Sequence, residues 1–184
     1  MLSAEPSTAP ALLKAGVCKR CSALLADAAS SQSVAAAAGL LANVNAFEGS
    51  WFCSAAHKSP EWQNAVKSTV WLTADPNPLP TKLAAAEAVG SILGSHAAQF
   101  LAGDTMQAAV MALGFLLADG GDAGLRSAAL QGLRKASEAK SAVSAVAESP
   151  TVEKVMAAMG DAEEDNALAA MQTVNNLARV SGEV

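Results

Sequence analysis

Residues 12–44 read LLKAGVCKRCSALLADAASSQSVAAAAGLLANV, with two runs of small and apolar residues separated by a polar turn. Alanine is the best helix former and a poor strand former, so each run predicts an α-helix. The first run ends in LLAD at Asp27, and the second opens on the alanine pair Ala36-Ala37. We interpret the rest of the chain from this unit of a helix, a turn and a second apolar helix.

The same unit recurs along the chain. Apolar runs end at Asp27, Asp75, Asp119 and Asp161, at intervals of 48, 44 and 42 residues. An alanine pair follows each aspartate, at Ala36-Ala37, Ala84-Ala85, Ala128-Ala129 and Ala169-Ala170. Repetition at this period is typical of solenoids, in which each unit buries its apolar faces against its neighbours.

Residues 12–44 resemble an armadillo repeat of the form LLxAGxxxxLxxLL…xxxAAxALxNL, and residues 166–178, NALAAMQTVNNLA, resemble the third helix of another. The resemblance implies an all-α fold, a right-handed α-solenoid of about four repeats. It also implies that the third helices line a concave groove that binds other proteins. We expect a flexible segment over 1–10 and one armadillo-like domain over 11–184, with repeats near 11–46, 50–95, 96–137 and 138–180.

The pattern also places the helices inside each repeat. First helices are expected near 9–15, 50–57, 96–102 and 138–147. Second helices are expected near 16–26, 61–74, 104–118 and 150–159, and third helices near 31–45, 80–94, 123–136 and 164–179. The pairs Ser59-Pro60 and Ser149-Pro150 place a proline in a first turn, and Asp104 and Asp165 are expected to be N-caps.

Composition excludes several classes of protein. Of 184 residues, 44 are alanine, 52% are apolar and 16% are charged, which indicates one folded domain. The net charge of −5 and the absence of a basic stripe argue against a nucleic-acid partner. The longest apolar run, 108–118, is far shorter than the roughly twenty residues that span a bilayer.

The start of the chain and the cysteines suggest a compartment. Residues 1–10, MLSAEPSTAP, lack the basic and apolar regions of a secretory signal. The three cysteines are an odd number and favour a reducing environment over a disulfide framework. We expect an intracellular location, with the cytoplasm first and a cilium or organelle interior as alternatives.

The resemblance assigns candidate partner-binding residues to the third helices. Armadillo grooves that grip extended peptides carry a tryptophan and an asparagine four residues apart, and the matching pairs here are Gly39/Asn43, Glu87/Ser91, Gln131/Lys135 and Gln172/Asn176. The expected groove residues are Asn43, Glu87, Ser91, Gln131, Lys135, Gln172 and Asn176. Since no pair holds a tryptophan, a broader protein surface or a helix is expected to suit this groove better than an extended basic peptide.

Four large aromatic residues, Trp51, Phe52, Trp62 and Trp71, lie in the second repeat. Trp51 and Phe52 belong to an insertion that has no counterpart in the other repeats, and they are candidates for an aromatic anchor at an interface. Local packing under the insertion is the alternative. Trp71 is expected to be packed, and it shares its position in the repeat with Ala23, Phe115 and Ala157.

Cys18, Cys21, Cys53 and His57 could complete a tetrahedral zinc shell. The repeat alignment favours packing instead. Cys18 falls on a position held elsewhere by Val66, Val110 and Val152, and Cys21 on one held by Thr69, Leu113 and Val155. Buried free cysteines behave as small hydrophobes, so zinc binding is kept as the alternative.

Other chemical candidates are also weak. A Cys53/His57 nucleophile would need an orienting group and an oxyanion site that the sequence does not reveal. The acidic run from Asp161 to Asp165 could hold a cation, but acids at the start of a helix are stabilised by its dipole, which is the preferred interpretation. We therefore expect no catalytic residue, no metal site and no cofactor.

These observations favour a non-catalytic interaction protein, either an adaptor or a small structural subunit of a larger assembly. Its partners would be other proteins, bound through the concave face or the open ends of the solenoid. At the C-terminal end, Met171, Val174 and Leu177 have little chain left to cover them. The alternative, by fold analogy alone, is a nucleotide-exchange cofactor of Hsp70 chaperones.

Overall fold

The computed structural model describes residues 9–27, 31–45, 57–118 and 122–181, and every regular element within them is a helix. The elements are α1 (Ala9–Lys14), α2 (Val17–Asp27), α3 (Ser31–Asn45), α5 (Pro60–Trp71), α6 (Leu79–Leu93), the 3₁₀ helix η1 (His96–Phe100), α7 (Gly103–Ala118), α8 (Ala123–Glu138), α9 (Val143–Ala147), α10 (Thr151–Ala158) and α11 (Glu164–Ser181). The prediction of an all-helical fold is confirmed for this part of the chain.

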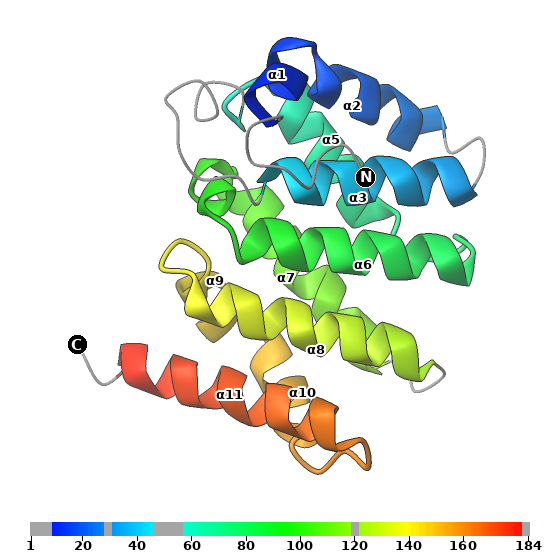
Figure 1. Cartoon of the computed structure of the whole chain (residues 1–184). Coiled ribbons are helices and arrows are strands. Elements are labelled where there is room, and N and C mark those ends of the chain that lie inside the picture. The colour runs from blue at the N-terminus through cyan, green and yellow to red at the C-terminus, as the bar shows by residue number, and fades with distance from the viewer. Residues whose placement is uncertain (1–8, 28–30, 46–56, 119–121, 182–184) are drawn as a thin grey trace.

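The helices stack in two layers (Figure 1). One, here called the third-helix layer, contains α3, α6, α8 and α11, and each of these helices contacts the next. The other, called the second-helix layer, contains α2, α5, α7 and α10, which also contact one another in that order. Each helix therefore packs against its counterpart in the neighbouring unit, as expected for an α-solenoid.

Local sequence sets several helix starts. The hydroxyl of Ser59 accepts a hydrogen bond from the N–H of Trp62 at 3.2 Å, and Pro60 opens α5. The Asp122 carboxylate caps α8 by accepting from the N–H of Leu125 at 2.9 Å.

Some sequence predictions of boundaries were wrong. Asp104 and Asp165 are not N-caps, because α7 begins at Gly103 and α11 at Glu164, which puts both acids inside the first turn. Such acids are still stabilised by the helix dipole. The first helix expected near 9–15 is α1, which begins at Ala9 and ends at Lys14. The helix expected over 138–147 is shorter, since α8 continues to Glu138 and α9 covers only 143–147.

The apolar interior forms two connected clusters. The N-terminal core holds buried residues of α2, α3, α5 and α6, such as Leu25, and the C-terminal core holds residues from α6 to α11, such as Leu113. Val70 and Leu101 pack against both. Burial is thus shared between adjacent repeats along the whole stack.

Two glycines allow a close helix contact in the third-helix layer. A Cβ added to Gly90 of α6 would lie 2.5 Å from the Cα of Gly132 of α8, so the two backbones touch where neither residue has a side chain. None of the helices in the described ranges is both long and apolar enough to cross a bilayer.

Candidate functional site

Three of the expected groove residues meet in one hollow between α6 and α8. Glu87, Gln131 and Lys135 line a space of about 520 Å³, together with Leu83, Gly90, Gly124, Ser127, Ala128 and Gly132. We call this hollow the third-helix groove. Gly90 and Gly132 form the bottom of this groove. Because neither has a side chain, the groove is open between the longer side chains at its rim.

The rim of the third-helix groove has mixed charge. Glu87 and Lys135 are exposed and of opposite sign, and Gln131 is half-buried. The Gln131 side-chain oxygen accepts a hydrogen bond from Arg134 at 3.1 Å, which leaves its amide NH₂ as a donor. The groove can therefore offer a carboxylate, an ammonium and an amide to a polar partner surface.

The remaining expected groove residues lie apart from this hollow. Ser91 is half-buried on α6 and does not line it, and Gln172 is exposed on α11. Asn176 donates to the Ser137 hydroxyl at 3.1 Å and so joins α11 to α8. The side chain of Asn43 falls outside the part of the structure that is described.

The aromatic anchor candidates cannot be placed in the same way. Trp51 and Phe52 lie outside the described residues, as does Cys53.

Cys18 and Cys21 lie in the N-terminal core, as the repeat alignment predicted. They are 7% and 2% exposed and are free thiols. Burial, with a smaller contribution from the neighbouring Cys21, raises the pKa of the Cys18 thiol to about 11, and burial also raises the pKa of Cys21. Both are therefore protonated near neutral pH, whereas zinc and electrophiles need the thiolate.

His57 is buried beside the same core. Its ring lies between Trp62, at 5.0 Å between centroids, and Phe100, at 5.9 Å, and neither ring nitrogen has a hydrogen-bond partner. Burial lowers the pKa of His57 to about 4, with a smaller contribution from His96. Within the described ranges, no three His, Cys, Asp or Glu side chains are grouped as a metal site would require.

The acidic run near residue 161 stabilises its own backbone. Asp161 accepts hydrogen bonds from the N–H of Glu163 at 3.0 Å and from Arg126 at 3.0 Å, and these two interactions lower the pKa of its carboxyl. Glu164 and Asp165 lie in the first turn of α11. This is the position in which the helix dipole stabilises a carboxylate.

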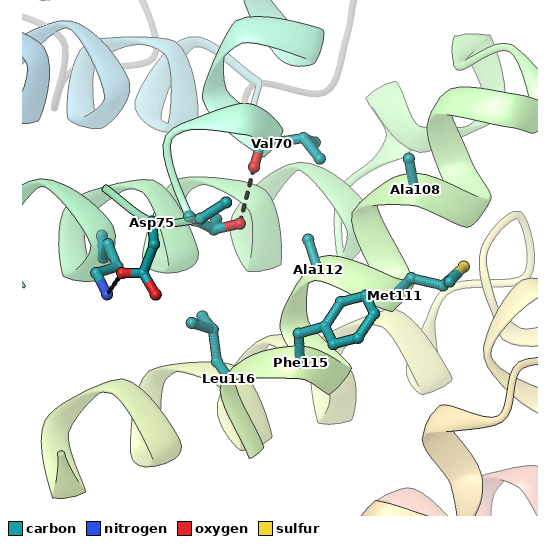
Figure 2. Close-up of a pocket in the computed structure, with 10 residues that line it drawn as sticks. Val70, Asp75, Ala108, Met111, Ala112, Phe115 and Leu116 are labelled. Atoms are coloured by element: carbon teal, nitrogen blue, oxygen red, sulfur yellow. Dashed lines mark hydrogen bonds and ion pairs between the residues drawn. The ribbon is translucent and has the colours of Figure 1, made fainter. Parts of the chain in front are cut away.

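The second-helix layer also holds an apolar groove that no sequence pattern indicated (Figure 2). Its volume is about 630 Å³, and it is lined by Met111, Ala112, Phe115 and Leu116 of α7, by Val70 and by the turn that carries Asp75. We call it the second-helix groove. Phe115 is 62% exposed, a large value for a phenylalanine.

The prediction that Trp71 is packed was wrong, since its side chain is 58% exposed. Phe115, Ala23 and Ala157, which share its position in the repeat, are exposed as well. The exposure of this position could have been inferred from the sequence. Two of the four repeats hold alanine there, and alanine fits a solvent-facing helix position as readily as a core one.

Both ends of the stack expose apolar side chains, but not all of those that the sequence suggested. At the C-terminal end Met171 is 46% exposed, as expected, but Leu177 is buried and Val174 packs against the C-terminal core. At the N-terminal end, a hollow of about 500 Å³ between α1, α2 and α3 is lined by apolar side chains that include Leu12 and Leu24.

Comparison with known proteins identifies the fold. The sequence matches no protein-family profile and no curated protein. Among solved structures, an engineered protein superposes with a TM-score of 0.72 at 20% identity, over 96% of this chain and 68% of its own. A designed armadillo repeat protein in complex with the peptide (KR)4 superposes with a TM-score of 0.70 at 17% identity, over 95% of this chain and 70% of its own. The chain has an armadillo-like repeat fold.

Proposed function

We propose that this armadillo-like solenoid is a non-catalytic scaffold that binds other proteins, as an adaptor or as a small structural subunit of an assembly. The third-helix groove is the observation that carries the proposal. Glu87 from one repeat and Gln131 and Lys135 from the next line a single hollow, so a partner lying across it would contact two repeats at once. Polar groups at the rim of such a surface fix the orientation of a partner, and desolvated apolar contacts supply most of the affinity.

The residues of the groove favour a folded partner over an extended basic peptide. The designed armadillo protein that shares this fold is in complex with the basic peptide (KR)4. In our chain the matching third-helix positions lack tryptophan, and the rim carries both signs of charge. We therefore propose a partner surface or helix with mixed charge, of which an acidic group would meet Lys135 and a basic group Glu87.

Two further features support membership of an assembly. The N-terminal end presents an apolar hollow and the C-terminal helix exposes Leu168 and Met171, which are the faces against which another repeat or subunit would stack. We propose that residues 11–184 act as one domain and that its location is intracellular. The free, buried thiols of Cys18 and Cys21 support a reducing compartment such as the cytoplasm.

A charge-swap variant tests the third-helix groove. Glu87→Lys combined with Lys135→Glu keeps the net charge and changes two exposed side chains. Affinity capture from the native source, read by mass spectrometry, should lose the partner in this variant. The matched control, Lys140→Glu with Glu148→Lys, swaps two other exposed charges and should retain it. Capture of the same partners by both variants would rule out the groove as the binding surface.

Trp51 and Phe52 are proposed as a second contact, an aromatic anchor. Trp51→Ala should weaken association with the captured partner by about tenfold or more while the melting temperature changes little. An equal loss of association and of thermal stability would instead indicate local packing.

A further inference from the structure

The C-terminal end of the stack exposes a helix face that is buried at the junctions between repeats. In the third-helix layer, Gly90 of α6 meets Gly132 of the next helix, α8. When the repeats are aligned on their alanine pairs, Gly90 corresponds to Asn175 of α11, and Ala86, one turn before it, corresponds to Met171. Ala86 is buried in the C-terminal core, whereas Met171 is 46% exposed and Asn175 is exposed as well. The outer face of α11 is therefore the face by which a third helix contacts the next repeat.

The second-helix layer ends in the same way. Gly114 of α7 meets Thr151 of α10 so closely that a Cβ added to the glycine would clash with the threonine side chain. Lys154 of α10 also reaches back and donates to the carbonyl of Gly114 at 3.1 Å. When the repeats are aligned on their aspartates, Gly114 corresponds to Met156 of α10, which is 55% exposed. We call Met156, Met171 and Asn175 the tail face, because each holds a position that contacts the following repeat at an inner junction.

The N-terminal end exposes the complementary positions. The hollow of about 500 Å³ at that end is lined by residues that include Val17 and Arg20 of α2 and Ala36 and Leu40 of α3, here called the head face. In the repeat alignment these four residues correspond in order to Thr151, Lys154, Ala128 and Gly132. Three of these counterparts, Thr151, Lys154 and Gly132, contact the preceding repeat at Gly114 or Gly90. The head face is therefore the surface on which a preceding repeat would stack.

The two faces also suit each other in shape. On the tail face, methionines stand where earlier repeats hold Gly114 and Ala86, so their side chains project further than those of their counterparts. The head face lies around an open hollow and presents the small side chain of Ala36. Methionine is unbranched and fills irregular apolar space well. The methionines at the tail of one copy can therefore enter the hollow at the head of another.

The charges at the two ends have opposite sign. Of the side chains described in α1 and α2, the charged ones are Lys14, Lys19 and Arg20, and all three are exposed. The acidic residues of α10, α11 and the turn between them are Glu153, Asp161, Glu163, Glu164 and Asp165. The basic residues described there are Lys154, which is turned back to Gly114 of its own chain, and Arg179, in the last turn of α11. Opposite charge favours contact of a head with a tail over contact between two heads or two tails.

We propose that the chain associates with itself head to tail, so that the tail face of one copy stacks on the head face of the next. Arg20 then does between copies what Lys154 does within the chain, and donates to the backbone carbonyl of Met156 in the preceding copy. Because the two faces differ, the contact is heterologous, and its repetition continues the solenoid into open chains. This inference rests on the proposed place of the chain in an assembly and identifies the neighbouring subunit as a second copy.

Sedimentation equilibrium of the full chain tests the proposal. Between about 1 and 100 μM protein, the average mass should rise from that of a monomer to beyond that of a dimer. Two variants block one face each, since Arg20→Glu reverses a charge of the head face and Met171→Arg places a cation on the tail face. Each variant alone should associate at least about tenfold more weakly. Mixed in equal amounts, the two should form a 1:1 dimer and nothing larger, because each retains one intact face.

Lys140→Glu is the matched control, because it reverses an exposed charge in the turn between α8 and α9, at the side of the stack (Figure 1). It should associate as the wild type does.

A monomeric wild-type chain, a mass that stops at the dimer, undiminished association in either blocking variant, an equal loss in Lys140→Glu, or a mixture that stays monomeric would each overturn the proposal. A monomeric chain that still captures partners through the third-helix groove would overturn this inference and leave the proposed function intact. Circular dichroism checks the fold of each variant. Both blocking substitutions replace exposed side chains, and if one variant unfolds the other still decides.

Discussion

His57 is an imidazole held in an apolar setting without hydrogen bonds. Its ring is 2% exposed between Trp62 and Phe100, and both of its nitrogens are unpaired. A buried group of this kind must stay neutral, which is why its pKa falls from 6.5 to about 4.

This burial predicts a loss of stability in mild acid. The pKa of His57 is lower in the folded chain, so the unfolded chain binds the proton first as the pH falls from 6.5 towards 4. The free energy of unfolding should therefore decrease over that range, by at most about 1.4 kcal/mol per pH unit. Urea unfolding at several pH values measures the slope, and His57→Phe should flatten it. Identical slopes in the two proteins would show that other groups cause any acid sensitivity.

The core cysteines predict inert thiols. In a Cys53→Ser variant, Cys18 and Cys21 should react with a disulfide reagent only after unfolding, because both are buried and protonated. At pH 8 we expect the native chain to react at least about a hundredfold more slowly than the urea-unfolded chain. Rapid reaction of either thiol in native buffer would contradict their placement in the N-terminal core.

Residue positions could be predicted where the repeat supplied several examples. Cys18 and Cys21 were placed in the core because valine and leucine hold the same positions in other repeats. His57 had no such guide, since its burial depends on Phe100, which is 43 residues away in the chain.

At the level of elements, we predict opposite effects when Gly90 of α6 and Gly39 of α3 are each replaced by alanine. In Gly90→Ala the new Cβ would lie 2.5 Å from the backbone of Gly132, so the helices must separate, which should cost about 1–3 kcal/mol of stability. Gly39→Ala on α3 is the matched control, because nothing lies within 4 Å of its added Cβ. The better helix propensity of alanine should stabilise that variant by up to about 1 kcal/mol. Urea unfolding of both should give opposite signs, and a stabilising Gly90→Ala would refute the close contact.

Helix positions were predictable to within a few residues, whereas the outward or inward direction of single side chains was not. Alanine-rich runs and proline starts located α5, α6, α7 and α10. The exposure of Trp71 was missed because hydrophobicity alone suggests burial. The third-helix residues Glu87, Gln131 and Lys135 were selected by register, but their meeting in one hollow depends on the Gly90 contact, which joins different repeats.

At the scale of the whole molecule, we predict that a core substitution destabilises the nearest repeats most and distant repeats least. Leu25→Ala removes a side chain that is 1% exposed in the N-terminal core and should cost about 2–5 kcal/mol locally. Because repeats contact mainly their neighbours, hydrogen exchange should accelerate most in α2 and α3, less in α6 and least in α11. Mass-spectrometric hydrogen exchange measures this order. Uniform acceleration in all helices would instead indicate a single cooperative unit.

Lys154 illustrates how a modular chain can diversify. The hollows at two successive junctions share some repeat positions, and at the later one Lys154, which stands where Ala112 stands one repeat earlier, reaches across to the carbonyl of Gly114. In such a protein, a single substitution could change the number of open hollows without any repeat being added or removed. Replacing Lys154 with alanine should therefore enlarge the later hollow in a chain of unchanged length.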